Sequence, residues 1–306
     1  MEELRLLVSP SPHIRDTDTT EKIMFAVLIS LLPVVAAAVY FFRWEAVRVL
    51  LLSAASAVAT EAIWQRLRNK PIRIGDGSAL ITGVLLGLSV PPTLPSWMVI
   101  LGAAVAIAIG KQVFGGLGHN PFNPALVGRA FLTASFGRAM TTWTAPFDAV
   151  TAATPLAMGA AVSRIPDLFF GSVAGSLGET SALAILLGGI YLFYKGVIDY
   201  RIPVGIGATV AVFALLAGEN PVFHLLAGSV LFGAVYMATD MVTSPVTKAG
   251  RWIFGVGIGV IIMVIRIWGG YPEGVTFAIL LMNAVTPLLN RWTRPRIYGQ
   301  GVKVSE

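Results

Sequence analysis

Long apolar runs separated by short polar connections dominate the chain. Most of these runs approach the roughly 20 residues that an α-helix needs to cross a bilayer. We therefore predict ten apolar helices, at about residues 22–42, 46–64, 78–90, 97–110, a fifth beginning near 124, then 181–195, 203–218, 222–239, 251–268 and 274–290. The pattern indicates an all-α polytopic membrane protein with about ten transmembrane helices.

Some of these helices are interrupted. The run 78–90 ends at Pro91 and Pro92, and at ~1.5 Å per residue it is too short for a hydrocarbon core of ~30 Å. The glycine- and proline-rich stretches 115–124 and 240–247 cannot form regular helix either. Broken helices are tolerated where they line a polar cavity, so these stretches are predicted to surround a ligand site.

A weak internal repeat suggests how the helices are arranged. Two similar motifs are each expected to open a helix: Asn123-Pro124 followed by Gly128-Arg129, and Ser244-Pro245 followed by Gly250-Arg251. Halves of five helices have opposite orientations, as in many transporters built from inverted repeats. We predict a tail and first five-helix repeat at 1–137, an extracytoplasmic connection at 138–180, and a second five-helix repeat with a basic cytoplasmic tail at 181–306.

Composition agrees with a membrane protein and excludes a soluble protein with one core. Hydrophobic residues make up 56% of the chain and charged residues 12%. The net charge of +6 does not indicate nucleic acid, because the basic residues are spread over the short connections. With the N-terminus in the cytoplasm, most of the 22 basic residues fall on the cytoplasmic side. This predicts a multi-pass protein of the bacterial cytoplasmic membrane with both termini cytoplasmic.

Cysteine chemistry is excluded, and metal binding is not indicated. The chain has no cysteine, and its three histidines show no ligand spacing. Any electron carrier held here is therefore organic or ligated through other atoms. No catalytic residue is predicted.

Polar residues beside the broken helices are candidate binding residues. The two loops expose backbone and side-chain groups suited to the edge of a flavin ring or to a sodium ion; the alternative is that they only cap helix ends. The candidates are Asn120, Asn123, Asp240, Thr243 and Ser244.

Arg129 lies inside an apolar run, where a charge is costly unless it is paired. It either binds a flavin phosphate or a carboxylate, or clamps loop carbonyls. Glu273, at the edge of another run, is expected to be solvated at the membrane interface.

The longest connection contains a small-residue island, Asp148-Ala149-Val150-Thr151-Ala152-Ala153-Thr154-Pro155-Leu156. By composition alone it is an Ala/Thr-rich loop. Residues before a proline disfavour helix, so the Thr154 hydroxyl is expected to be accessible, as a modification site requires.

This spacing resembles the flavin-attachment motif of the D subunit of Rnf electron-transport complexes and of the related B subunit of sodium-pumping NADH:quinone oxidoreductase. The family's usual glycine is replaced here by Ala152. Further stretches resemble the Rnf D subunit in the same order: 11–15, 76–79, 82–83, 91–92, 115–125, 237–240, 243–245, 270–274 and 281–283. The resemblance implies FMN joined through its phosphate to Thr154, with Asp148 and Thr151 in the same motif, and a second, non-covalent flavin (riboflavin or FMN) near the inner side.

The implied function is electron relay within an ion-translocating ferredoxin:NAD oxidoreductase, coupled to movement of Na+ or H+. Implied partners are the iron–sulfur, flavoprotein and integral membrane subunits of that complex, an external flavin transferase, and membrane lipid. The rival hypothesis is a stand-alone channel or transporter for a small solute, because the inverted repeat also resembles the urea-transporter plan. A covalent flavin distinguishes the two, since a passive channel has no use for one.

Overall fold

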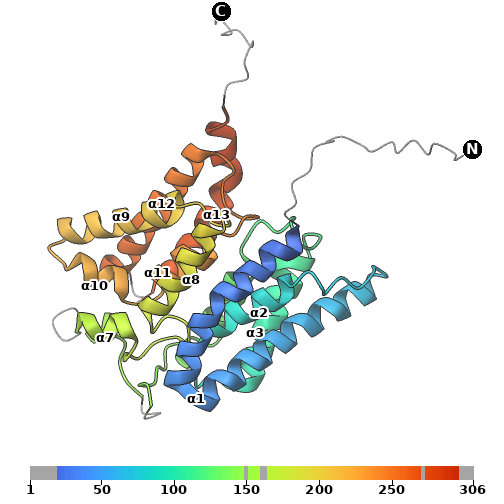
Figure 1. Cartoon of the computed structure of the whole chain (residues 1–306), viewed down its shortest axis with the longest axis horizontal. Helices are drawn as coiled ribbons and strands as arrows, with labels where there is room; N and C mark the ends of the chain where they lie inside the picture. Colours follow the sequence, from blue (N-terminus) through green and yellow to red (C-terminus); the bar gives the residue numbers. More distant parts are fainter. Residues whose placement is uncertain (1–18, 148–150, 159–163, 270–272, 296–306) are drawn as a thin grey trace, which may run out of the picture.

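The first long helix is folded back on itself. The computed structural model describes residues 19–147, 151–158, 164–269 and 273–295. Helix α1, Thr20–Leu67, contains both of the first two predicted helices and bends sharply at Arg43, whose φ is 50°, so that its two arms form a V (Figure 1). Thr20, in the first arm, and Gln65, in the second, line the same cavity. Both arms therefore end at the same face of the protein, which we call the proximal face. The bend lies at the opposite face, which we call the distal face.

Helices from the first part of the chain pack against this V. They are α2 (Ser78–Leu88), α3 (Ser96–Ile107) and the π-helical turn η1 (Ala108–Gln112), and α4 (Pro124–Ser135) packs on these three. Glycine allows close approach: a Cβ on Gly128 would lie 2.7 Å from the carbonyl oxygen of Gly102 on the neighbouring helix. Small residues at helix contacts are typical of membrane proteins, where packing replaces the hydrophobic effect between helices. As predicted, α2 is short and ends before Pro91.

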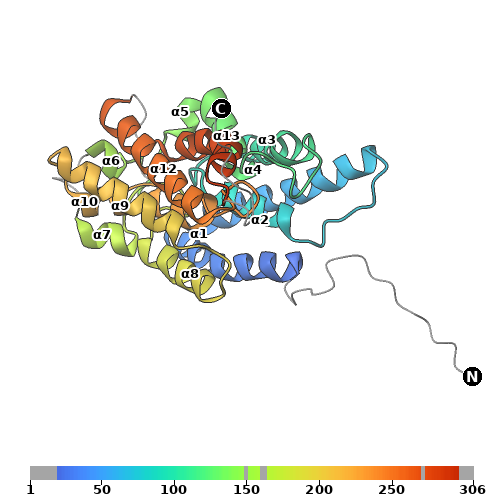
Figure 2. The same ribbon diagram turned by 90° about the horizontal axis from the view of Figure 1, so that it is seen from above.

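The later helices form a second group beside the first (Figures 1 and 2). They are α8 (Ala182–Tyr194), α9 (Arg201–Leu216), α10 (Pro221–Leu226), α11 (Val230–Phe232), the π-helical turn η2 (Gly233–Met237), α12 (Lys248–Trp268) and α13 (Val275–Trp292). The helix predicted at 222–239 is thus broken, and Gly228 with φ 69° lies in the break. The two groups meet where α8 packs on α1 and where the Tyr236 hydroxyl donates to the carbonyl of Ser30 at 2.7 Å.

Short helices and turns make up the long connection between the groups. They are α5 (Gly137–Met140), α6 (Pro155–Met158) and α7 (Ile165–Phe170). The stretch after α7 reaches the end of the broken helix α2, where the Gly178 amide donates to the carbonyl of Leu88 at 2.7 Å. Across the described ranges the chain forms no strand, only an isolated bridge between Thr144 and Thr151.

The two motifs of the predicted repeat begin their helices differently. Asn123 caps α4, with Pro124 in its first turn. Pro245, in contrast, precedes α12 by three residues, because Thr247 is the residue whose side chain caps that helix. Both motifs therefore lie at the start of a helix, with the proline of the first inside the helix and the proline of the second just before it. Within the part of the chain that the structure describes, two helices, Thr20–Leu67 and Lys248–Trp268, are long and apolar enough to cross a membrane by length and composition.

Candidate functional site

A cavity lies between the two helix groups, toward the proximal face. Its volume is about 110 Å³. Its walls are mostly apolar, with Leu85, Leu192 and Val235 among them. Polar groups enter from Lys111, Asn120, Asn123 and Asp240, so the cavity unites three of the predicted binding residues.

The two asparagines play different parts in this central cavity. The Asn123 side chain is fully engaged: its oxygen accepts from the amides of Ala125 and Leu126, and its nitrogen donates to the carbonyl of Met237 at 3.2 Å. Asn120 donates to the carbonyl of Phe122 at 3.0 Å, but its oxygen is buried without a hydrogen-bond partner among the described residues. A buried polar atom normally has a partner, so Asn120 is the asparagine with capacity for a ligand.

The predicted loop at 240–247 is held by hydrogen bonds within itself and to α13. Asp240 accepts from the Val242 amide and from the Thr243 hydroxyl, both at 3.2 Å. The carbonyl of Thr243 accepts from Asn283 and Thr286 on α13. Asp240 lines the central cavity, whereas Thr243 and Ser244 are buried but do not line it.

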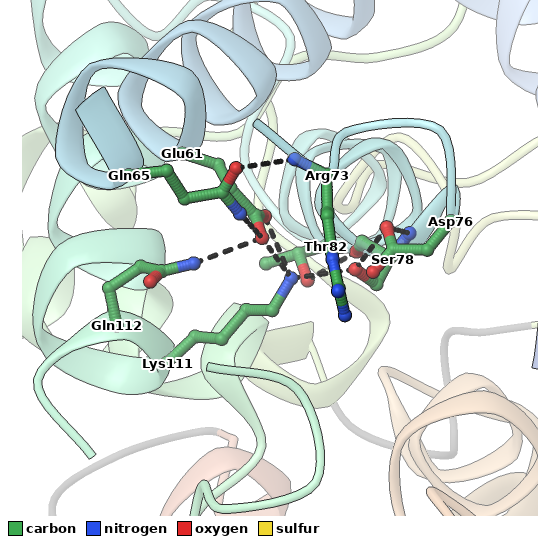
Figure 3. A network of polar contacts seen from close by, with 8 residues as sticks. All are labelled: Glu61, Gln65, Arg73, Asp76, Ser78, Thr82, Lys111 and Gln112. Carbon is green, nitrogen blue, oxygen red and sulfur yellow. Dashed lines mark hydrogen bonds and ion pairs between the residues drawn. The ribbon is translucent and has the colours of Figure 1, made fainter. Parts of the chain in front are cut away.

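A buried ion pair closes the cavity on the proximal side (Figure 3). Lys111, on η1, is 1% exposed, and its ammonium lies 2.9 and 2.7 Å from the two carboxylate oxygens of Glu61 on α1. The same ammonium donates to the hydroxyl of Ser78, at the start of α2, at 2.6 Å. One lysine thus fixes three helical segments that are far apart in the sequence.

Amide side chains complete this network. Gln112 donates to Glu61 at 2.9 Å and Gln65 donates to it at 3.2 Å, while the Gln65 oxygen accepts from the backbone amide of Arg73. Glu61, Gln65 and Gln112 line an open cavity at the proximal face, and Lys111 lines the central cavity behind it. The ion pair is therefore the partition between the two. The sequence did not reveal the pairing of Lys111 with Glu61, although a charged side chain within an apolar run needs a partner.

The flavin-motif segment lies near the distal face, away from the central cavity. Thr151 is exposed, but Thr154 is only 7% exposed. The expectation of an accessible Thr154 was wrong, because Leu156 packs into a small apolar cluster with Leu168, Phe223 and Ala227 and draws the segment inward. Asp148 lies outside the described residues.

Arg129 lies deep among the distal segments and binds two carboxylates. One guanidinium nitrogen donates to Glu179 at 2.8 Å and another pairs with Glu273. Of the roles considered for Arg129, carboxylate pairing is the one present. The expectation that Glu273 is solvated at the interface was wrong, since its side chain is 16% exposed and held by this pair.

A second buried arginine borders the same region. Arg266 donates to the carbonyls of His224 and Ala227 at 2.6 and 2.7 Å, which fastens the break between α10 and α11 to α12. Glu179 and Glu273 also line a small cavity of about 10 Å³ together with Thr154. The structure therefore contains two separate polar regions, the central cavity and this distal chamber beneath the Thr154 segment.

Comparison with known proteins places the whole chain in one family. The model of the NQR2, RnfD, RnfE family matches residues 7–299. The D subunit of the Na(+)-translocating ferredoxin:NAD(+) oxidoreductase complex of Acetobacterium woodii is 50% identical, over 98% of this chain and 97% of that protein. The D subunit of the proton-translocating ferredoxin:NAD(+) oxidoreductase complex of Clostridium ljungdahlii is 44% identical, over 95% and 96%. The D subunit of the ion-translocating oxidoreductase complex of Stutzerimonas stutzeri is 40% identical, over 93% and 94%. The chain belongs to the NQR2, RnfD, RnfE family.

Proposed function

We propose that this chain is the D-type membrane subunit of an ion-translocating ferredoxin:NAD oxidoreductase complex, in which it relays electrons through flavin. The observation that carries the proposal is the full-length identity of 50% to a protein named as such a subunit. In this proposal residues 1–137 and 181–306 are two inverted halves, and the connection 138–180 carries the flavin. Partners are the other subunits of the complex, lipid and a flavin transferase. A stand-alone solute channel is not favoured, because the family match covers the chain almost from end to end.

The covalent flavin is FMN, esterified through its phosphate to Thr154. The motif around Thr154 supports this position, and the chamber beside it, with a volume of about 10 Å³, is too small for a ring system. Leu156 anchors the segment in a small apolar cluster, and the Ala152 amide donates to the carbonyl of Trp143 at 2.9 Å. Modification therefore requires the segment to lift, and the attached ring lies outside the chamber.

Substitution of the two threonines tests the attachment site. Co-expressed with a flavin transferase, the protein is expected to fluoresce in a denaturing gel, because an ester survives denaturation. Thr154→Val removes the attachment oxygen and should abolish the band, whereas the matched change Thr151→Val should retain it. Loss of fluorescence in Thr151→Val but not in Thr154→Val would place the attachment on Thr151. A wild-type protein without fluorescence would refute the covalent flavin.

The second flavin occupies the central cavity and is not covalent. Asn120, whose oxygen has no partner among the described residues, together with Asp240, would hold its polar edge, and Leu85, Leu192 and Val235 would contact the ring. Bound there, a flavin supplies reversible uptake of one or two electrons.

Removal of the Asn120 amide tests this cavity. Asn120→Ala is expected to weaken binding of the acid-extractable flavin roughly tenfold, since one buried hydrogen bond is lost, while gel fluorescence from Thr154 persists. Asn220→Ala, at the N-cap of α10 and outside the cavity, is the control. Equal flavin content in both variants would show that the cavity does not hold the flavin through Asn120.

Orientation follows from the distribution of basic residues, with the proximal face cytoplasmic. Because the chain has no cysteine, single cysteines report orientation without background. Lys70 and Thr142 are both exposed, and they are near the proximal and distal faces respectively. An impermeant thiol reagent on intact cells should label Thr142→Cys and spare Lys70→Cys; the reverse labelling would invert the topology.

A further inference from the structure

Buried polar atoms without partners gather around the distal chamber. Among the described residues, eight buried side-chain atoms lack a hydrogen-bond partner. Five of them belong to residues in or beside the chamber: Glu179 Oε2, Ser176 Oγ, Thr180 Oγ1, Ser229 Oγ and Arg266 Nε. Such atoms normally bind ordered water or an ion, because leaving them dry is unfavourable. Their concentration at one place marks the chamber as a binding site.

Glu179 is the charged group of this site. It lines the chamber, and its side chain is 2% exposed. Oε1 accepts from Arg129 at 2.8 Å, but Oε2 has no partner among the described residues. A buried carboxylate with a bare oxygen has lost its hydration on that side, so it favours a cation or a proton there.

The neighbouring oxygens fit a cation better than an anion. Thr180 lines the chamber, and Ser176 lies on the same turn as Glu179, whose amide donates to the carbonyl of Ser176 at 3.2 Å. Ligation by carboxylate and hydroxyl oxygens alone suits a hard cation, and the bare carboxylate oxygen would repel an anion.

Two arginines lie beside the two carboxylates of the chamber. Arg129 and Arg266 face Glu179 and Glu273, and burial raises the pKa of Glu179 to about 8. Arg129 uses its nitrogens on the two carboxylates, and Arg266 directs its terminal nitrogens to the carbonyls of His224 and Ala227. The positive charge of the arginines opposes a divalent ion more strongly than a monovalent one.

We propose that the distal chamber binds one monovalent cation, Na+ or H+, through Glu179 Oε2 with the hydroxyls of Ser176 and Thr180. The segment 151–158, which carries Thr154 and Leu156, covers the chamber. The proposal rests on the proposed function, because it names where a transported ion resides near the distal face. Binding itself does not require a flavin on Thr154.

Binding of radioactive ²²Na+ to the purified full chain in detergent tests the Na+ form of the site. Saturable binding is expected in wild type. Glu179→Gln should abolish it, and Ser176→Ala with Thr180→Val should weaken it at least tenfold. Each change removes only a hydroxyl and nearly keeps the side-chain volume, so the double variant should fold. Glu45→Gln and Thr209→Val, which lie outside the chamber, are the matched controls and should bind as wild type does.

If no Na+ binds, infrared spectroscopy tests whether the site binds H+ instead. A protonated Glu179 should give a carbonyl band that disappears as the pH is raised. The same band should be missing in Glu179→Gln. Sodium binding that survives both chamber variants, or neither Na+ binding nor this band, overturns the proposal and leaves a chamber that holds water only. Thr154→Val is expected to bind the cation normally, so a missing flavin and a missing cation site give different results.

Discussion

Arg129→Leu lowers the free energy of unfolding by about 3–5 kcal/mol, because it leaves two carboxylates buried without their cation. Glu179 and Glu273 come from segments 50 and 144 residues away in the chain, so the loss also loosens the distal connection. Denaturant titration of the purified protein, followed by circular dichroism, measures the effect.

Two companion variants separate pairing from simple packing. Arg129→Lys should recover part of the stability, since an ammonium cannot bind both carboxylates with a planar fork. Arg129→Leu combined with Glu179→Leu and Glu273→Leu should be far more stable than Arg129→Leu alone, because no uncompensated charge remains. Equal stability of the single and triple variants would show that the pair is not what Arg129 contributes.

Lys111→Met should cost about 3 kcal/mol of unfolding free energy, at the lower end for a broken buried ion pair, because Gln65 and Gln112 still donate to Glu61. It should also open the partition between the proximal cavity and the central cavity, so that the acid-extractable flavin dissociates faster. Lys111→Met with Glu61→Leu should recover only part of the stability, because the uncompensated charge is gone but Gln65 and Gln112 lose their acceptor. Unchanged stability in Lys111→Met would mean that the ion pair is solvated and does not separate the proximal cavity from the central cavity.

The helical plan could be predicted because apolar length alone defines it. The ends of α8, α9, α12 and α13 fall within three residues of their predicted positions. The break at Gly228 was missed because a single glycine within an apolar run does not show whether it will adopt a positive φ. The fold around Arg43 was expected as a short connection, and the structure makes it a bend inside one helix.

The candidate site was harder to predict, because its energetics depend on contacts between distant segments. The sequence shows that Arg129 and Lys111 sit in apolar surroundings, but not which carboxylate each one meets. Glu273 was misplaced for this reason. Thr154 was expected to be accessible from local backbone preference, whereas the contact that buries it comes from Leu156 against residues of α7 and α10.

Mass spectrometry of the peptide that contains Thr154 is the most direct test of the account. The protein should be purified from cells that make the whole complex, so that the transferase and the partner subunits are present. The account predicts that the peptide carries the mass of FMN less one water, with fragment ions placing it on Thr154 and the change absent from Thr154→Val. An unmodified peptide from the active complex would contradict it.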